Sequence, residues 1–250
     1  MDPHSIDPAR HYPIQKTDDY ILGRCYESAQ KIYTPAVHPR EPFATSRGMR
    51  VSPFYEREVA LGGYFMEVAG WERAHGYAAN EETLLAKYRD QVPVREAEWD
   101  SRHFWEVSNA EQLAMSDGVG MINLSHFAIF DVEGADAEGL MEYLSVAKVG
   151  ADTAIGKGVY THFLDHAGGI RSDLTIIRLA EDCFRVVCGG DTGHRDYIWM
   201  RDMSDRKGFP NVTFHDRSEE LATLGLWGPE ARVTLAKLME DPESISNESF

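Results

Sequence analysis

HAGGIRSDLTIIRLAEDCFRVVCGG, residues 166–190, contains two apolar, β-branched runs separated by a short polar turn. Such runs around a turn of a few residues predict an antiparallel β-hairpin. If residues 180–182 form the turn, the numbers of paired residues sum to a constant along the ladder. The pairs on the apolar face are then Leu174 with Cys188 and Ile176 with Val186. Because successive side chains of a strand alternate between faces, this register also decides what the other face carries.

Asp173 lies on that other face of the predicted hairpin, across from Gly189, which has no side chain. The remaining pairs on this face are Thr175 with Val187 and Ile177 with Arg185. A carboxylate beside an empty position is a suitable ligand site, and Gly168 and Gly169 before it permit close approach of the backbone. The alternative is a solvated or turn-capping aspartate, which is common after a Gly-Gly turn. Spacing alone leaves both interpretations open.

The rest of the chain continues the same pattern of strand pairs separated by single helices. Short connections between such elements predict an α+β fold with antiparallel sheets and flanking helices. Strands are expected at residues 64–73, 119–125, 127–134, 158–164, 170–179, 183–190, 211–216 and 221–227. Helices are expected at residues 18–30, 53–61, 108–117, 135–146, 192–203 and 229–240. Residues 1 to about 50 are rich in proline, tyrosine and charge, and they predict an irregular arm around the first helix.

Two of these helices carry local signals. Ser108 and Glu111 match a capping box that would start the third helix, and Gly118 fits its carboxyl end. In the fourth helix, the helical spacing predicts one apolar face, formed by Leu140, Tyr143 and Leu144.

Composition restricts the class of protein. The chain has 250 residues, 43% of them hydrophobic and 26% charged, which is an ordinary mixture for a globular protein with a core. Its formal net charge of -16 argues against nucleic acid or an anionic membrane surface as a partner. No apolar run approaches the roughly 20 residues of a membrane span, and the first ten residues contain no secretory signal. We therefore expect a soluble, cytoplasmic protein.

The cysteines and histidines predict neither a disulfide framework nor a metal site. Three cysteines, Cys25, Cys183 and Cys188, are an odd and sparse set, typical of a reducing compartment. The last two lack a nearby His-x-x-x-His partner, so no metal is expected. Four histidines in the second half have no ligand-like spacing and are expected to be surface or satisfied sheet residues: His162, His166, His194 and His215.

Several common catalytic motifs are absent from the sequence. The glycine-rich segments lack a Walker lysine and the Gly-x-Gly-x-x-Gly pattern, which argues against a phosphate-binding loop. The Gly-x-Ser-x-Gly nucleophile elbow is also missing.

An ordered string of motifs nevertheless resembles a known family. GYFMEVAGWER at residues 63–73 is similar to the end of the flavin-linked module of dimethylglycine and sarcosine dehydrogenases. Residues 95–134 resemble the start of the folate-binding aminomethyltransferase fold attached to that module, a fold shared with the glycine cleavage T-protein. GVYTHFLDHAGGIRSDLTIIRL, FRVVCGG and LGLWGPEARVTLAKL continue the resemblance in order. It covers the chain from about residue 18 onward.

The resemblance implies a fold and a domain organisation. The chain would hold the first part of an aminomethyltransferase (T-protein-like) fold. Residues 1–90 would be an arm and the tail end of a flavin-oxidoreductase central module, and residues 91–250 the N-terminal portion of the folate-binding domain. The flavin-binding portion and the family's later half are not in the sequence. The chain is therefore expected to be the middle of a longer enzyme, a truncated product, or one subunit of a split enzyme.

The resemblance also implies a chemistry in one-carbon metabolism. An N-methylated amine such as dimethylglycine or sarcosine would be oxidatively demethylated, and tetrahydrofolate would take up the carbon as 5,10-methylenetetrahydrofolate. FAD would belong only to a separate or missing module, and a flavoprotein module or partner subunit is an expected partner. Asp173 corresponds to the family's key carboxylate. Folate-lining positions carry over to Phe127, Tyr160, Val187 and Gly189.

Other functions remain open at this level. The chain could be a demethylase for another methyl donor. It could also be a non-catalytic folate-binding protein, like relatives that assist iron–sulfur assembly, or a structural subunit that completes a partner's site. Ordinary sheet packing would equally explain Phe127 and Val187.

Overall fold

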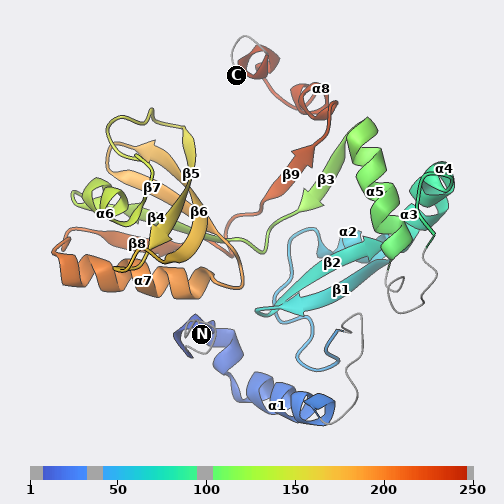
Figure 1. The fold of residues 1–250 in the computed structure, drawn as a ribbon, viewed down its shortest axis with the longest axis horizontal. Coiled ribbons are helices and arrows are strands. Elements are labelled where there is room, and N and C mark those ends of the chain that lie inside the picture. Colours follow the sequence, from blue (N-terminus) through green and yellow to red (C-terminus); the bar gives the residue numbers. More distant parts are fainter. Residues whose placement is uncertain (1–7, 33–41, 95–103, 247–250) are drawn as a thin grey trace. The chain divides into compact units, whose positions relative to one another are not determined.

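The computed structural model describes residues 8–32, 42–94 and 104–246, and the chain divides into two compact units (Figure 1). Residues 1–21 and 125–223 form one of them, here called the sheet unit. Residues 22–124 and 224–250 form the other, here called the ribbon unit.

A five-stranded antiparallel sheet with the strand order β5-β6-β7-β4-β8 is the centre of the sheet unit (Figure 1). Its strands are β4 (Ala128–Glu133), β5 (Gly158–Leu164), β6 (Ile170–Ala180), β7 (Cys183–Cys188) and β8 (Thr213–Asp216). Its helices are α6 (Ala137–Leu144) and α7 (Gly193–Lys207), preceded near the amino terminus by the short helices η2 (Pro8–Arg10) and η3 (Pro13–Lys16). The antiparallel sheet with flanking helices confirms the predicted fold class.

The β6–β7 hairpin has the predicted register. Its ladder joins Leu174 to Cys188 and Ile176 to Val186. The turn is one residue shorter than expected because Ala180 still belongs to β6. The register shifts between Arg178 and Ala180, and the pairs from Arg178 back to Leu174 follow the predicted register. The preceding β5–β6 turn explains one glycine of the opening stretch. Gly168 has φ of 85°, a left-handed conformation that favours glycine, so it serves the turn.

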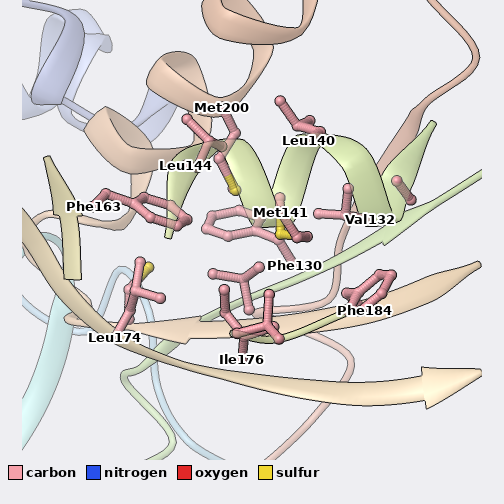
Figure 2. Packing of buried hydrophobic residues seen from close by; sticks show 14 of the residues in the cluster. Phe130, Val132, Leu140, Met141, Leu144, Phe163, Leu174, Ile176, Phe184 and Met200 are labelled. Atoms are coloured by element: carbon pink, nitrogen blue, oxygen red, sulfur yellow. The ribbon is translucent and has the colours of Figure 1, made fainter. Parts of the chain in front are cut away.

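Helices α6 and α7 cover one face of the sheet and bury a continuous apolar core (Figure 2). The largest sheet residues in it are Phe130, Val132, Phe163, Leu174, Ile176, Phe184 and Val186. The helices contribute Ala137, Leu140, Met141, Leu144, Met200 and Met203. Burying each large side chain contributes about 1.5–3 kcal/mol, so this face holds the sheet unit together. The expectation that Tyr143 shares the apolar face of α6 with Leu140 and Leu144 was wrong, because Tyr143 is 46% exposed while the other two are buried.

The ribbon unit contains two two-stranded ribbons. One joins β1 (Gly63–Val68) to β2 (Trp71–Tyr77), and the other joins β3 (Gly120–Asn123) to β9 (Leu224–Trp227). Its helices are α2 (Tyr55–Ala60), α3 (Ala78–Asn80), η4 (Glu81–Leu85), α4 (Ala86–Tyr88), α5 (Trp105–Asp117), α8 (Ala231–Ala236) and η6 (Pro242–Ile245). Helix α1 (Asp18–Ile32) crosses the division between the units.

Two local expectations in the ribbon unit were wrong. The single strand expected at residues 64–73 is a hairpin, because Ala69 and Gly70 both have positive φ and reverse the chain. The capping box at Ser108 does not start α5. That helix already begins at Trp105, and the Ser108 amide donates a helical hydrogen bond to the Phe104 carbonyl.

Candidate functional site

The predicted site residues lie along one end of the sheet, on or beside the face that α6 and α7 leave uncovered. Asp173 on β6 pairs with His162 on β5. Continuing the β6–β7 register by one residue places Asp173 across from Gly189, and continuing the β4–β7 register places Gly189 across from Phe127. These positions form a row, here called the first row, of which two lie just beyond the ends of β4 and β7 and two lie on β6 and β5: Phe127, Gly189, Asp173 and His162.

A second row lies two residues further into the sheet, on the same face. Its members are Ile129, Val187, Thr175 and Tyr160, which pair directly from strand to strand. All five residues predicted from the sequence therefore fall within two adjacent rows. The hairpin pattern alone had related only three of them to one another.

Asp173 points to the open side of the sheet, while its neighbours Ser172 and Leu174 are buried. Its Oδ2 accepts a hydrogen bond of 3.1 Å from the hydroxyl of Tyr160, a side chain that is 63% exposed. This hydrogen bond to a carboxylate raises the pKa of the Tyr160 phenol. The strand thus presents its carboxylate to the outside, in a fixed orientation, instead of to its own core.

The backbone that carries Asp173 is attached to α7. Ser172 Oγ donates to Asp196 Oδ2 at 2.7 Å, and Arg195 Nη2 donates to the Arg171 carbonyl at 2.6 Å. Asp196 is buried, and this burial raises its pKa against the opposing effect of the hydrogen bond from Ser172 and the charge of Arg195. These contacts hold the start of β6 in place, so Asp173 stands on a rigid support.

The remaining predicted residues have simple environments. Val187 is half-buried between its partners Ile129 and Thr175. Gly189 starts the loop into α7, where its carbonyl accepts a 3.2 Å hydrogen bond from the Thr192 amide. As a glycine, it leaves no side chain between Phe127 and Asp173. Phe127 is half-buried, with its ring 5.4 Å from that of His126.

A charged network occupies the other end of the open face. Arg185 donates two hydrogen bonds to Asp131, of 2.7 and 2.9 Å, and Arg217 donates a third of 3.2 Å. The hydrogen bonds from Arg185 lower the pKa of Asp131 despite the burial of the carboxylate. The carboxylate of Asp131 is thus paired with two arginines of the same network, whereas the carboxylate of Asp173 is exposed.

The sequence did not identify His162 as a site residue. It was expected to be a surface residue or a sheet residue with its hydrogen bonds satisfied. The alternation of side chains along β5 places His162 and Tyr160 on one face, and the pairing with β6 places His162 opposite Asp173. The sequence signal that could have identified His162 was the alternation along β5, read together with the pairing of β5 and β6. In the parts of the chain that the structure describes, no three His, Cys, Asp or Glu side chains gather as a metal-binding group.

Comparison with known families finds two matches along the chain. Residues 54–250 match the family described as "GCVT N-terminal domain", and residues 1–52 match "FAD dependent oxidoreductase central domain".

Curated relatives cover the whole chain at modest identity. It is 30% identical over 250 residues to 4-methylaminobutanoate oxidase (formaldehyde-forming) of Paenarthrobacter nicotinovorans, and 28% identical over 278 residues to mitochondrial sarcosine dehydrogenase of Mus musculus. The whole chain aligns in both cases but spans only 28% and 30% of these proteins. An aminomethyltransferase of Herpetosiphon aurantiacus is 28% identical over 77% of the chain and 44% of its own length.

The solved structure of the glycine cleavage system aminomethyltransferase T from Bartonella henselae has a similar fold, with a TM-score of 0.57 and 23% identity. The match covers 76% of this chain and 44% of that one. Within residues 8–32, 42–94 and 104–246, no helix has the length and apolar character needed to cross a bilayer.

Proposed function

Because this chain belongs to the GCVT N-terminal domain family, we propose that it is the folate-binding module of an enzyme that demethylates an N-methylated amine. The amine would be of the dimethylglycine or sarcosine type, and the product 5,10-methylenetetrahydrofolate. One observation carries the proposal: an exposed carboxylate, its tyrosine partner and an apolar wall lie in two adjacent rows at one end of a sheet. Asp173 would be the catalytic residue, and Phe127, Tyr160, Val187 and Gly189 would contact the folate.

The residues present fit such a ligand. When bound, tetrahydrofolate would supply the nitrogen nucleophiles that take up the one-carbon unit. The carboxylate of Asp173 is accessible and oriented by Tyr160, so it can stabilise positive charge beside it and accept a proton. Val187 and Phe127 offer half-buried apolar surface to a flat ring.

The chain does not fit FAD in the same way. Its sequence has no Gly-x-Gly-x-x-Gly fingerprint to hold a dinucleotide, so FAD would be bound by a separate module or partner subunit. The match of residues 1–52 to the central domain of FAD-dependent oxidoreductases supports such a flavoprotein neighbour. The division of the chain at residues 90 and 91 and its cytoplasmic location stay predictions.

Calorimetric titration of tetrahydrofolate into the chain, under anaerobic conditions, tests the proposal. We expect saturable binding, and a loss of about 10- to 100-fold in affinity for Asp173→Asn, the equivalent of one hydrogen bond to a charged group. Asp182→Asn is the matched control, because this exposed aspartate lies in the turn at the other end of the same hairpin. Absence of binding, or equal affinity in both variants, would contradict the proposal.

A further inference from the structure

A cavity of about 370 Å³ lies in the sheet unit, where the carboxyl end of α6, the end of β5, the β5–β6 turn and the middle of α7 meet. This volume falls within the range of small-molecule sites. Leu144 and Met203 line the cavity and also belong to the core, so it lies beside the covered face, whereas Asp173 is on the open face. Its apolar and aromatic lining consists of Tyr143, Leu144, Val146, Leu164, Trp199 and Met203.

Two polar atoms of the lining residues are buried without a partner in the protein. The Ser145 hydroxyl and the Trp199 indole nitrogen have no hydrogen-bond partner within residues 8–32, 42–94 and 104–246. Unpaired buried polar atoms destabilise a fold, and they are therefore few in native proteins. An indole N–H can only donate, and a hydroxyl can donate as well as accept. Their presence around one cavity indicates a ligand that supplies a hydrogen-bond acceptor.

Both donors are held by fixed parts of the chain. Ser145 directly follows α6 and is joined to Phe163 of β5 by an isolated β-bridge. Trp199 lies on α7, with the Arg171 guanidinium 3.9 Å from the centre of its ring and the His166 ring 6.0 Å away. Because these contacts orient the indole, the site is largely formed before a ligand binds.

The charges of the lining favour a neutral ligand. Asp165 contributes a carboxylate, and the lining contains no lysine or arginine. An anionic ligand would therefore meet a like charge without a cation of the lining to offset it. A cationic ligand would leave the indole N–H of Trp199 unpaired. A neutral carbonyl oxygen on an apolar body satisfies the two donors and the apolar lining together.

We propose that this cavity is a second ligand site, for a small neutral molecule that joins an apolar ring or chain to a carbonyl oxygen. The carbonyl accepts hydrogen bonds from Trp199 Nε1 and Ser145 Oγ, and the apolar part packs against Leu144, Leu164 and Met203. The proposal does not depend on the proposed function, because no lining residue belongs to the two rows around Asp173.

The first test titrates ε-caprolactam, a neutral cyclic amide, into the chain and follows the indole N–H resonances by NMR. The Trp199 resonance is identified by its loss in Trp199→Phe. We expect it to move downfield to saturation, with a Kd on the order of 1 mM, as suits a ligand of this size. The indole of Trp227, exposed in the ribbon unit, is the internal control and should not move. Absence of a saturable shift at Trp199 would overturn the inference.

Two serine variants distinguish a ligand site from a packing defect. Ser145→Ala removes an unpaired hydroxyl, so the midpoint of chemical denaturation should stay the same or rise, while caprolactam binds about three- to tenfold more weakly. Ser172→Ala is the matched control. It removes a buried hydroxyl that donates to Asp196, so the midpoint should fall and the caprolactam affinity should stay the same. Unchanged affinity in Ser145→Ala would contradict the proposal.

Two further titrations test the separation of the sites and the choice of a neutral ligand. Asp173→Asn should bind caprolactam as tightly as the unchanged chain, and weaker binding would place caprolactam at the folate site instead. Cyclohexanecarboxylate should bind more weakly than caprolactam because of Asp165, and tighter binding would overturn the preference for a neutral ligand. A chain that binds caprolactam at Trp199 but no tetrahydrofolate would retain this site and lose the proposed function.

Discussion

The two faces of the five-stranded sheet are built from alternate residues of the same strands, yet they differ in almost every property. The face beneath α6 and α7 carries a closed apolar core, whereas the opposite face carries polar and charged groups beside a few aliphatic ones. On that opposite face Asp131 and Ile129 are buried, and Asp173 and Tyr160 are exposed. Ser172 and Asp173 show the contrast between adjacent residues. Ser172 is 6% exposed and donates a hydrogen bond to Asp196, whereas Asp173 is exposed and accepts a hydrogen bond from Tyr160.

This difference separates the residues that stabilise the sheet unit from those proposed to bind folate. The covered face accounts for the free energy of folding, so it tolerates few substitutions. The open face buries Asp131 and Ile129, but its end around Asp173 is exposed and contributes little to folding. That end can therefore hold a carboxylate, a phenol and an imidazole at small cost. Substitutions on the covered face should therefore lower the free energy of unfolding. Substitutions around Asp173 on the open face should mainly lower the affinity for the ligand.

The largest effect is expected for Phe130→Ala on the covered face. Phe130 is 1% exposed, and its removal leaves a cavity beneath α6 and α7 that costs about 3–5 kcal/mol. Chemical denaturation measures this loss in the free energy of unfolding. Thr175→Ala, on the open face of the adjoining hairpin, is the control and should cost less than about 0.5 kcal/mol. Similar losses in the two variants would remove the distinction between the faces.

Asp196→Ala should have the next largest effect. It deprives Ser172 and Arg195 of their acceptor in a buried place, which costs about 1–3 kcal/mol. Asp173→Asn, one residue from Ser172 but on the open face, should change the free energy of unfolding by less than about 0.5 kcal/mol. Denaturant unfolding of both variants decides whether adjacent positions behave so differently.

Two aspartates of the sheet unit should make the free energy of unfolding change with pH in opposite directions. The pKa of Asp131 is lowered below 3.8 by hydrogen bonds from Arg185, so its contribution is present above that pH and is lost on acidification. The pKa of Asp196 is raised by burial, so the folded state retains its proton and stability declines as pH rises beyond 3.8. Unfolding free energies between pH 3 and 6 test this. Asp131→Asn should reduce the loss in acid, and Asp196→Asn should reduce the decline toward pH 6.

The smallest effect is expected for Tyr160→Phe. The lost hydroxyl is exposed, so the free energy of unfolding should change by less than about 0.5 kcal/mol. Asp173 loses its orienting hydrogen bond, however, and tetrahydrofolate affinity should fall about two- to fivefold. Tyr143→Phe on α6 is the control and should leave both quantities unchanged. A large loss of stability in Tyr160→Phe would show that the open face also supports the fold.

The predictions of local structure from the sequence failed at two places, the turn at Ala69 and the start of α5. Ala69 adopts a left-handed conformation that non-glycine residues rarely take, so the hairpin at residues 63–77 had no strong turn signature. The capping box at Ser108 was overridden because Phe104 and Val107 pack in the apolar cluster of η4, α4 and α5, which extends the helix backwards. Propensity is a weak guide when packing favours another boundary.

What the sequence by itself determined is local. The spacing of β-branched residues and the short turn after Ala180 were enough to pair Leu174 with Cys188 and to place Asp173 on the other face. Only the tertiary structure decided what surrounds Asp173. The insertion of β4 between β7 and β8 brings Phe127 next to Gly189, and the pairing of β5 with β6 brings His162 to the carboxylate. A hairpin register follows from turn length and alternation, whereas neighbours distant in the chain are chosen by how the whole sheet buries its apolar face against α6 and α7.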